Sequence, residues 1–368
     1  MRLTCSRKNL NFALGIVGLA VSPSTTLPVL NNILIKAADK KLFFFATNLE
    51  IAISYSVPVD VKNEGAITVP AKLIANYIAF LEDEEVEMRL EEGMTLAIKT
   101  KTSQTKIKGI SPDEFPLIPK IEKETIIELA AKDLAETIDY TVFSAAATGT
   151  RPILAGVYLR AEKDTLKAVA TDSFRLAEKK TKLSKKTEKP TECIVPIRTM
   201  LELNRVLGFG YKNETVLVHI SKNQILFTLN GVELISRLIE GKFPDYEKII
   251  PKATRTKIEA DVNHLVMATK RVSLFAKENN NSIKLTATNN GKLQIATDET
   301  RIGEEKAELD IKIQGENNKI ALNSQYLLDV LTKLKEKVNI EMDEKLTPVV
   351  IKPGKKEDYL YIIMPLKV

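Results

Sequence analysis

Residues 170–176 read Ala-Thr-Asp-Ser-Phe-Arg-Leu, and the beginning of this stretch recurs twice elsewhere in the chain. Thr47 and Thr297 each follow an alanine, as Thr171 does, and each precedes Asn or Asp. The three threonines lie 124 and 126 residues apart. One short motif is weak evidence, but this spacing indicates a sequence repeat.

Two further markers keep the same period. Pro70, Pro196 and Leu322 each open a run with helical spacing of apolar residues, and they lie 126 residues apart both times. A third marker, at the start of an earlier helical run in each copy, agrees more loosely. Three unrelated markers at one period predict three copies of one module.

The repeat divides the 368 residues into three predicted domains, 1–122, 123–252 and 253–368. Each is long enough to bury its own core. Helical runs alternate with period-two strands, which predicts an α+β fold with antiparallel sheets and two helices in each module. We expect helices at 6–21, 70–81, 131–143, 196–207, 262–275 and 324–335, and a last strand at 359–365.

Composition bounds the class of protein. The net charge of +6 permits contact with nucleic acid without demanding it. Cys5 and Cys193 are far apart and indicate neither a disulfide framework nor a metal motif, which favours a reducing cytoplasm. No apolar run approaches the roughly 20 residues of a membrane span, and the N-terminal residues lack a signal-peptide pattern.

Residue types that usually carry catalysis are scarce. His219 and His264 have no partner at metal-ligand or catalytic spacing, so they are interpreted as structural. Residues 15–18 lack the length and the lysine of a phosphate-binding loop, and the acidic run 82–85 is typical of solvated surface. We therefore expect a protein that is not an enzyme and has no catalytic residue, metal or cofactor.

Basic residues recur on the predicted helices of all three copies. They are Lys72, Arg198, Arg205, Lys270 and Lys333. Glu202 shares the face of Arg198 and Arg205, and the charge run 179–189 is typical of a solvated loop. Exposed amphipathic helices explain these charges without a ligand. The alternative is a ring whose helices face DNA phosphates, where Lys and Arg bind a backbone regardless of its sequence.

Six segments follow one another in a characteristic order. They are 26–32 (Thr-Leu-Pro-Val-Leu-Asn-Asn), 68–71 (Thr-Val-Pro-Ala), 170–176, 243–246 (Phe-Pro-Asp-Tyr), 326–331 (Tyr-Leu-Leu-Asp-Val-Leu) and 364–368 (Met-Pro-Leu-Lys-Val). In these segments and their spacing, over essentially its whole length, the chain resembles the bacterial sliding clamps, the β subunits of DNA polymerase III.

This resemblance implies a head-to-tail homodimer that forms a ring of six modules, with helices lining the hole and sheets outside. Such a ring has no catalytic site. It encircles double-stranded DNA without sequence specificity and tethers polymerases, among them the DNA polymerase III α subunit, and repair proteins through short peptides. A clamp loader opens it. The expected location is the cytoplasm, on the nucleoid, with no membrane partner.

The resemblance also implies a peptide-binding groove with two subsites. The first would comprise Leu154, Thr171, Ser173, Phe174, Arg175, Leu176, Pro244, Lys248, Ile249, Ile362 and Met364. The second would comprise Asn323, Tyr326, Leu346, Pro348, Ile363, Pro365, Leu366 and Lys367. Aliphatic walls with Met and Pro suit Leu or Phe anchors from many partners. From periodicity alone, 359–365 would be a plain core strand.

DNA contacts and the subunit seam follow in the same way. The expected DNA contacts are Lys72, Arg151, Arg198, Arg205, Lys270 and Lys333. At two further positions where members of the family contact DNA, this chain has Ser24 and Thr148. At the seam, the match places Ile107 against Leu274 and Phe275 of the other subunit. Independently, Lys106 and Lys108 are basic whereas Glu304 and its neighbours are acidic, so we expect the two regions to pair.

Several positions depart from the family pattern. Ser173 and Phe174 stand where the family usually has Gly and an aromatic or His, Asn280 replaces an aromatic beside the groove, and Thr105 replaces an aromatic at the seam. Two other functions remain open on the residues alone. They are a DNA-modifying enzyme on a triplicated scaffold and a DNA-binding or peptide-binding adaptor that forms no ring.

Overall fold

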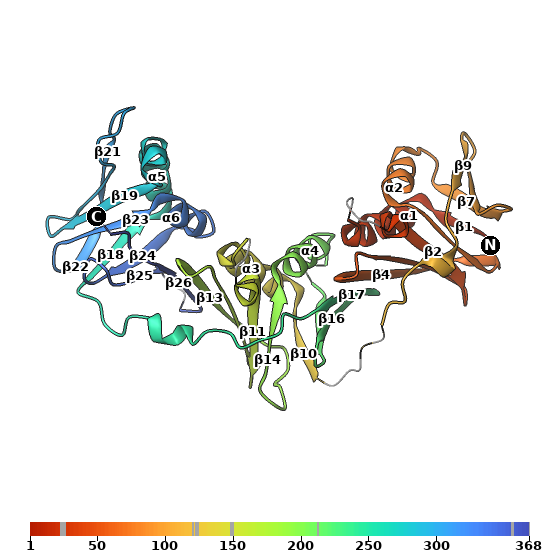
Figure 1. Cartoon of the computed structure of the whole chain (residues 1–368), viewed down its shortest axis with the longest axis horizontal. Helices are drawn as coiled ribbons and strands as arrows, with labels where there is room; N and C mark the ends of the chain where they lie inside the picture. The colour runs from red at the N-terminus through yellow and green to blue at the C-terminus, as the bar shows by residue number, and fades with distance from the viewer. Residues whose placement is uncertain are drawn as a thin grey trace. The chain divides into compact units, whose positions relative to one another are not determined.

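The computed structural model describes residues 1–22, 27–119, 121, 125–147, 151–211, 213–354 and 357–367 (Figure 1). The chain folds into two compact units. Unit 1 comprises Met1–Lys132, Leu183–Thr187 and Arg198–Leu238, and unit 2 comprises Asp133–Lys182, Glu188–Ile197 and Ile239–Val368. Of the residues named above, Ser24, Thr26, Thr148 and Val368 lie outside the described residues.

Unit 1 contains two antiparallel sheets. The first has the order β5-β1-β7-β8-β9, from β1 (Arg2–Ser6), β5 (Asp60–Asn63), β7 (Glu85–Glu91), β8 (Thr95–Lys99) and β9 (Gln104–Lys108). The second has the order β10-β15-β16-β17-β4-β3-β2-β6, from β2 (Asn32–Ala38), β3 (Lys41–Thr47), β4 (Ile51–Pro58), β6 (Gly65–Pro70), β10 (Thr125–Ala130), β15 (Thr215–Ile220), β16 (Gln224–Leu229) and β17 (Val232–Arg237). Its helices are α1 (Arg7–Val17), α2 (Ala71–Phe80) and most of α4 (Ile197–Leu207).

Unit 2 repeats this plan. A nine-stranded sheet has the order β14-β11-β12-β13-β26-β25-β24-β18-β22, from β11 (Gly156–Glu162), β12 (Thr165–Thr171), β13 (Arg175–Lys182), β14 (Thr191–Pro196), β18 (Thr256–Asp261), β22 (Lys312–Gly315), β24 (Lys337–Met342), β25 (Val349–Pro353) and β26 (Tyr359–Ile363). A second sheet has the order β21-β20-β19-β23, from β19 (Ser282–Thr288), β20 (Lys292–Ala296), β21 (Lys306–Asp310) and β23 (Asn318–Asn323). Its helices are most of α3 (Ala131–Thr141), α5 (Val262–Ala276) and α6 (Ser324–Leu331).

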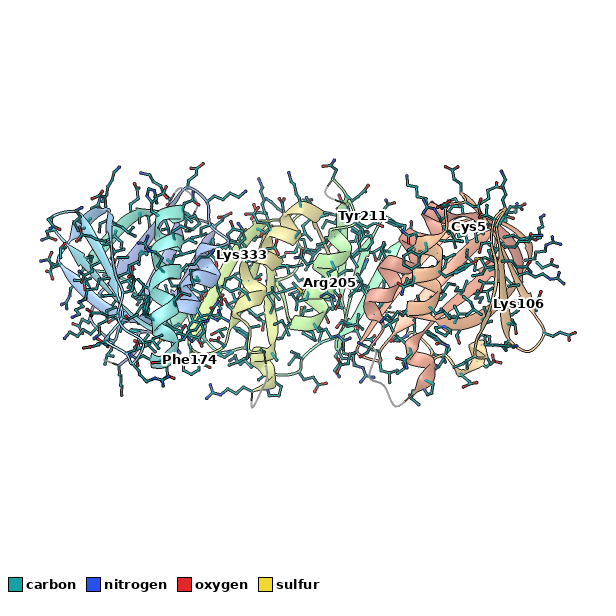
Figure 2. All side chains as sticks on the ribbon, turned by 90° about the horizontal axis from the view of Figure 1, so that it is seen from above. Cys5, Lys106, Phe174, Arg205, Tyr211 and Lys333 are labelled. Atoms are coloured by element: carbon teal, nitrogen blue, oxygen red, sulfur yellow. The ribbon has the colours of Figure 1, made fainter. Side chains whose placement is uncertain are left out.

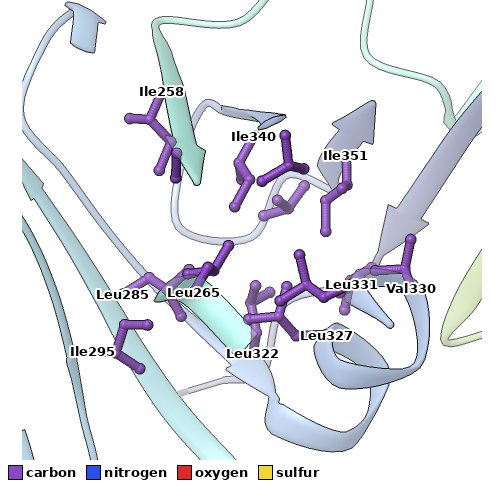
Figure 3. Packing of buried hydrophobic residues seen from close by; sticks show 14 of the residues in the cluster. Ile258, Leu265, Leu285, Ile295, Leu322, Leu327, Val330, Leu331, Ile340 and Ile351 are labelled. Carbon is purple, nitrogen blue, oxygen red and sulfur yellow. The ribbon is translucent and has the colours of Figure 1, made fainter. Parts of the chain in front are cut away.

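The core of each module lies where the helices meet the sheets. In the last module, Leu265 on α5 and Leu327 on α6 are fully buried with Ile258 and Ile340 from the sheet (Figure 3). Both helices begin at side-chain caps, since Asp261 accepts from the N–H of His264 at 3.0 Å and Asn323 accepts from the N–H groups after it. The caps fix where each apolar stripe starts and therefore which side chains face the core.

Most predicted elements are found, but several details are corrected. Pro70 occupies the N-cap position of α2 instead of its first helical position, and Leu73, an apolar residue of this helix, is 53% exposed. The predicted helix 324–335 ends at Leu331, where backbone hydrogen bonds close its last turn. The helices expected at 131–143 and 196–207 bury their apolar stripes, with Leu134 and Ile138 buried on α3 and Met200 and Leu203 buried on α4.

The charge run 179–189 is not simply a solvated loop. Lys179 lies in β13 and is only 4% exposed, and its ammonium group contacts Glu136 at 3.0 Å and Asp358 at 2.8 Å. The strand continues through Lys182 because it is paired with β12, and as far as Lys179 also with β26. The density of charge in the sequence predicted a loop. In the structure, strand pairing satisfies the backbone hydrogen bonds of Lys179, and two carboxylates neutralise its buried ammonium group.

We predict that neither thiol reacts in the native chain. Desolvation by burial raises the pKa of Cys5 to about 11, against a weaker opposing hydrogen bond from the backbone of Ser6, and burial raises the pKa of Cys193 to about 12. Because the thiolate is the nucleophile, Ellman's reagent at pH 8 should titrate no thiol before denaturation and both thiols after it. Labelling of the native chain would show that β1 or β14 opens locally.

Candidate functional site

The groove in unit 2 is built on the turn between β12 and β13. Thr171 Oγ1 donates to the carbonyl of Arg175 at 2.7 Å, and Asp172 Oδ1 accepts from the backbone N–H groups of Phe174 and Arg175 at 2.9 and 3.0 Å. Ser173 has φ of +79°, a left-handed conformation that these bonds hold in place. The turn therefore presents the Ser173 and Arg175 side chains in a fixed geometry.

Beside this turn lies a cavity of about 380 Å³ with a mainly apolar lining. Leu154, Leu176 and Ile362 form its buried wall and belong to one hydrophobic cluster. Ile249 borders the opening and is 40% exposed. Met364 completes the lining, and its N–H donates to the carbonyl of Phe174 at 2.8 Å. The chain after β26 is thus held against the turn, so the cavity has a firm rim.

Arg175 is the charged residue at the centre of this site. Its Nε contacts Asp172 Oδ2 at 2.9 Å and its Nη1 pairs with Asp329, while its guanidinium lies 4.6 Å from the ring centre of Tyr326. Desolvation lowers the pKa of Arg175, but the neighbouring Tyr361 hydroxyl and the two carboxylates outweigh it, so the pKa is raised overall. Arg175 stays cationic and joins the turn to α6.

Nine of the eleven residues predicted for the first subsite line this cavity. The two exceptions are Phe174, which is 60% exposed, and Lys248, which pairs with Asp245 at 2.8 Å. Phe174 is labelled in Figure 2. Five further residues line the cavity but were not assigned to the groove from the sequence: Arg151, Pro152, Ile153, Asp245 and Tyr246. Of these, Arg151 was assigned to DNA contact instead. The segment 243–246 was a usable signal for Asp245 and Tyr246, because it is one of the six segments that carry the resemblance.

Residues predicted for the second subsite lie outside this cavity. Ile363 is fully buried in the core, so it can support the groove but cannot touch a ligand. Asn323 caps α6, and the backbone carbonyl of Tyr326 accepts from Tyr361 at 3.0 Å. Leu346 is 60% exposed. The remaining members are half-buried or exposed; they are Pro348, Pro365, Leu366 and Lys367.

The residues expected to meet DNA differ in exposure. Lys72 and Lys270 are exposed on α2 and α5, whereas Arg198 is half-buried. Half-buried Lys333 lies beyond the end of α6 (Figure 2). Arg151 is exposed at the groove rim, where it donates to Ser173 at 3.4 Å.

The expected basic face of α4 needs correction. Glu202 is 8% exposed, so it does not share an open face with its neighbours. It pairs with the exposed Arg205 at 3.0 Å. Helical spacing alone did not reveal this burial, because it depends on what packs beside the helix. The positive charge of Arg205 is therefore partly neutralised by the buried Glu202.

The seam residues lie at two sheet edges. β9 is the last strand of one sheet in unit 1, and β21 is the last strand of one sheet in unit 2. On β9, Ile107 is buried, while Lys106 pairs with Glu91 at 2.7 Å. Near β21, Leu274 is 60% exposed. Half-buried Phe275 precedes a helix end, and Glu304 contacts Lys306 at 3.0 Å.

The described residues contain neither a candidate membrane-spanning helix nor a candidate metal site. None of their helices combines the length and apolar character of a membrane span. No group of three or more His, Cys, Asp or Glu side chains in that part of the chain is placed to hold a metal ion.

Comparisons with known proteins agree along the whole chain. Family models for the DNA polymerase III beta subunit match residues 1–119 (N-terminal domain), 128–245 (central domain) and 247–367 (C-terminal domain). The beta sliding clamp of Staphylococcus aureus is 29% identical over 358 residues, covering 95% of this chain and 94% of that protein. The DNA polymerase sliding clamp of Bacillus subtilis superposes with a TM-score of 0.95 at 28% identity, covering 100% and 99% of the two chains. A Pseudomonas aeruginosa sliding clamp bound to griselimycin has a TM-score of 0.95 at 28% identity, with both chains fully covered.

Proposed function

The chain belongs to the DNA polymerase III beta-subunit family, the bacterial sliding clamps, and on that premise we propose that two copies close head to tail into a ring around duplex DNA. Members of this family are processivity subunits without catalytic activity. The protein is accordingly a DNA sliding clamp and not an enzyme.

Ring closure is supported by one observation, the pairing of strands between repeats. β4 of the first repeat pairs with β17 of the second, and β13 of the second pairs with β26 of the third. By their order in the repeat, β21 corresponds to β4 and β13, and β9 corresponds to β17 and β26. β9 and β21 are both edge strands. An unpaired edge is a template for another chain, and a head-to-tail contact that closes gives a ring.

Charge fits the same pairing. β9 carries Lys106 and Lys108, and β21 carries Glu308 and Asp310. The acidic pair already contacts Lys292 at 3.3 and 2.9 Å, so the seam charges are partly satisfied within one chain. We therefore assign these charges to orientation more than to affinity. Ile107 is already buried within one chain and can only support the seam, so apolar contact by Leu274 and Phe275 supplies most of the affinity.

DNA contact by the ring is weak and independent of sequence. We propose that Lys72, Arg198, Arg205, Lys270 and Lys333 meet phosphates through water or directly, as loose point charges do. Arg151 lies at the rim of the unit 2 groove, so it can contact a docked peptide as well as DNA. A ring needs little DNA affinity because it is held by topology, and weak contacts allow sliding.

Partners dock in the unit 2 groove. We propose that polymerases, including the DNA polymerase III α subunit, the clamp loader and repair proteins insert short peptides there, with an apolar anchor in the cavity beside Leu176 and Met364. Arg175 then orients the peptide backbone from a position fixed by two carboxylates. The proposed location is the cytoplasm, on the nucleoid.

The first experiment is retention on circular DNA before and after it is cut. The protein is loaded on a nicked circle by its clamp loader in moderate salt, and bound protein is measured by gel filtration. We expect stable retention on the circle and rapid loss after linearisation, because a ring slides off a free end. Blocking both ends of the linear DNA should restore retention. Equal retention on open linear DNA would instead mean ordinary electrostatic binding, and the proposal of a closed ring would be wrong.

A further inference from the structure

Unit 1 contains a second turn built like the one beneath the unit 2 groove. Thr47 Oγ1 donates to the carbonyl of Ile51 at 2.9 Å, and Asn48 Oδ1 accepts from the N–H groups of Glu50 and Ile51 at 3.0 and 2.8 Å. Leu49 has φ of +76°, close to the +79° of Ser173. The same hydrogen bonds therefore hold the same backbone conformation in both units.

The neighbouring strand also corresponds. Ala52 on β4 lies opposite Ile235 on β17, as Leu176 on β13 lies opposite Ile362 on β26. Two residues after Ile235, the N–H of Arg237 donates to the carbonyl of Glu50 in the turn at 3.2 Å. In unit 2 the equivalent bond runs from Met364 to Phe174. Arg237 therefore occupies the place of Met364.

A hollow of about 110 Å³ lies at this turn, compared with about 380 Å³ in unit 2. Its apolar lining includes Ile51, Pro116 and Ile118. Two further lining side chains are unusually open for apolar residues, since Leu49 is 49% exposed and Leu117 is 98% exposed. The space suits one aliphatic side chain, and the exposed leucines offer apolar surface beside it.

Charge distinguishes this hollow from its counterpart. The Arg237 side chain is exposed and lines the hollow, and it forms no ion pair with any residue that the structure describes. Glu50 also borders the hollow. The residue at the equivalent position of the unit 2 turn is Phe174, which does not line the groove there. A ligand seated like one in unit 2 would thus meet a guanidinium where the other groove offers a thioether.

We propose that this hollow is a second docking site, for a short extended peptide from a partner protein in which one aliphatic side chain is followed by an acidic one. The aliphatic group would lie between Leu49 and Ile118, and the carboxylate would pair with Arg237. The proposal rests on the proposed role of the unit 2 groove in peptide binding, because the two sites share one architecture.

Methyl NMR of the full chain, labelled at isoleucine δ1 methyls, can observe both sites in one sample. Ile51, Ile118 and Ile235 report on unit 1, while Ile153, Ile249 and Ile362 report on unit 2. Three blocked peptides serve as probes: Ser-Gly-Leu-Glu-Gly, its charge-reversed form Ser-Gly-Leu-Lys-Gly, and the apolar Ser-Gly-Ser-Leu-Phe. We expect the first peptide to shift the unit 1 methyls and the third to shift the unit 2 methyls.

The charge contact is tested by R237Q and by the lysine peptide. Each should weaken binding at the unit 1 methyls about two- to fivefold, as loss of an exposed ion pair does, and R237Q should leave the Leu-Phe peptide at unit 2 unaffected. If the Leu-Phe peptide binds unit 2 while no peptide shifts the unit 1 methyls, this inference fails alone. If the glutamate and lysine peptides bind unit 1 equally, the acidic preference is wrong. If neither site responds to any probe, the proposed groove fails as well.

Discussion

Replacing Leu274 with aspartate is expected to convert the dimer into monomers at concentrations where the unchanged protein stays closed. Leu274 lies near the end of α5, which packs against the edge strand β21, and it is 60% exposed in the single chain. An exposed leucine contributes little to the fold of the monomer. In the proposed seam it is covered by the other subunit, where a carboxylate would be buried without a partner. We expect the dimer dissociation constant to rise by about 100-fold or more.

Sedimentation velocity over a dilution series measures this effect directly. Leu201→Asp is the matched control, because Leu201 is 42% exposed on another helix, α4, and lies outside the proposed seam. Both variants should unfold at nearly the temperature of the unchanged chain. L274D should also lose retention on circular DNA, since an open ring has no topological hold. A dimer constant for L274D equal to that of the control would exclude Leu274 from the interface.

The second large effect is expected for Ile249→Asp in the groove of unit 2. Ile249 borders the cavity opening and is 40% exposed, so the folded chain tolerates a charge there. A peptide that places Leu or Phe in the cavity would have to bury that carboxylate against its own apolar anchor. The lost apolar contact and the desolvation of the charge together should weaken binding about 10- to 100-fold.

Fluorescence anisotropy with a labelled Ser-Gly-Ser-Leu-Phe peptide measures the change. Ile126→Asp is the control, since Ile126 is 51% exposed on β10 and lies outside the groove. I249D should still form dimers, because the seam is elsewhere, but it should load poorly on circular DNA, because the clamp loader is proposed to dock in the same groove. Undiminished peptide binding by I249D, with the control also unchanged, would mean that the apolar anchor enters another part of the surface.

Much of the groove could be anticipated, for a definite reason. Its turn at 171–175 is a local structure whose Thr and Asp are visible in the sequence, and the resemblance carried most of the wall. Ile153 and Tyr246 were missed although Leu154 and Pro244 of the same segments were assigned to the groove, because packing decides which side chains of a segment line the cavity. The same limit applies to Ile363. It lies in the strand expected at 359–365, but its side chain is buried in the core, which the sequence did not show.

The sequence by itself determined the threefold repeat, the antiparallel α+β modules and the inward faces of helices such as α3. These features depend on periodicity within a few turns or strands, which residue order records directly. Only the tertiary structure decided that Lys179 and Glu202 are buried, and that Arg237 stands where Met364 stands in the other unit. Each of these outcomes depends on elements that the fold brings together, and no local pattern encodes the environment that such neighbours create.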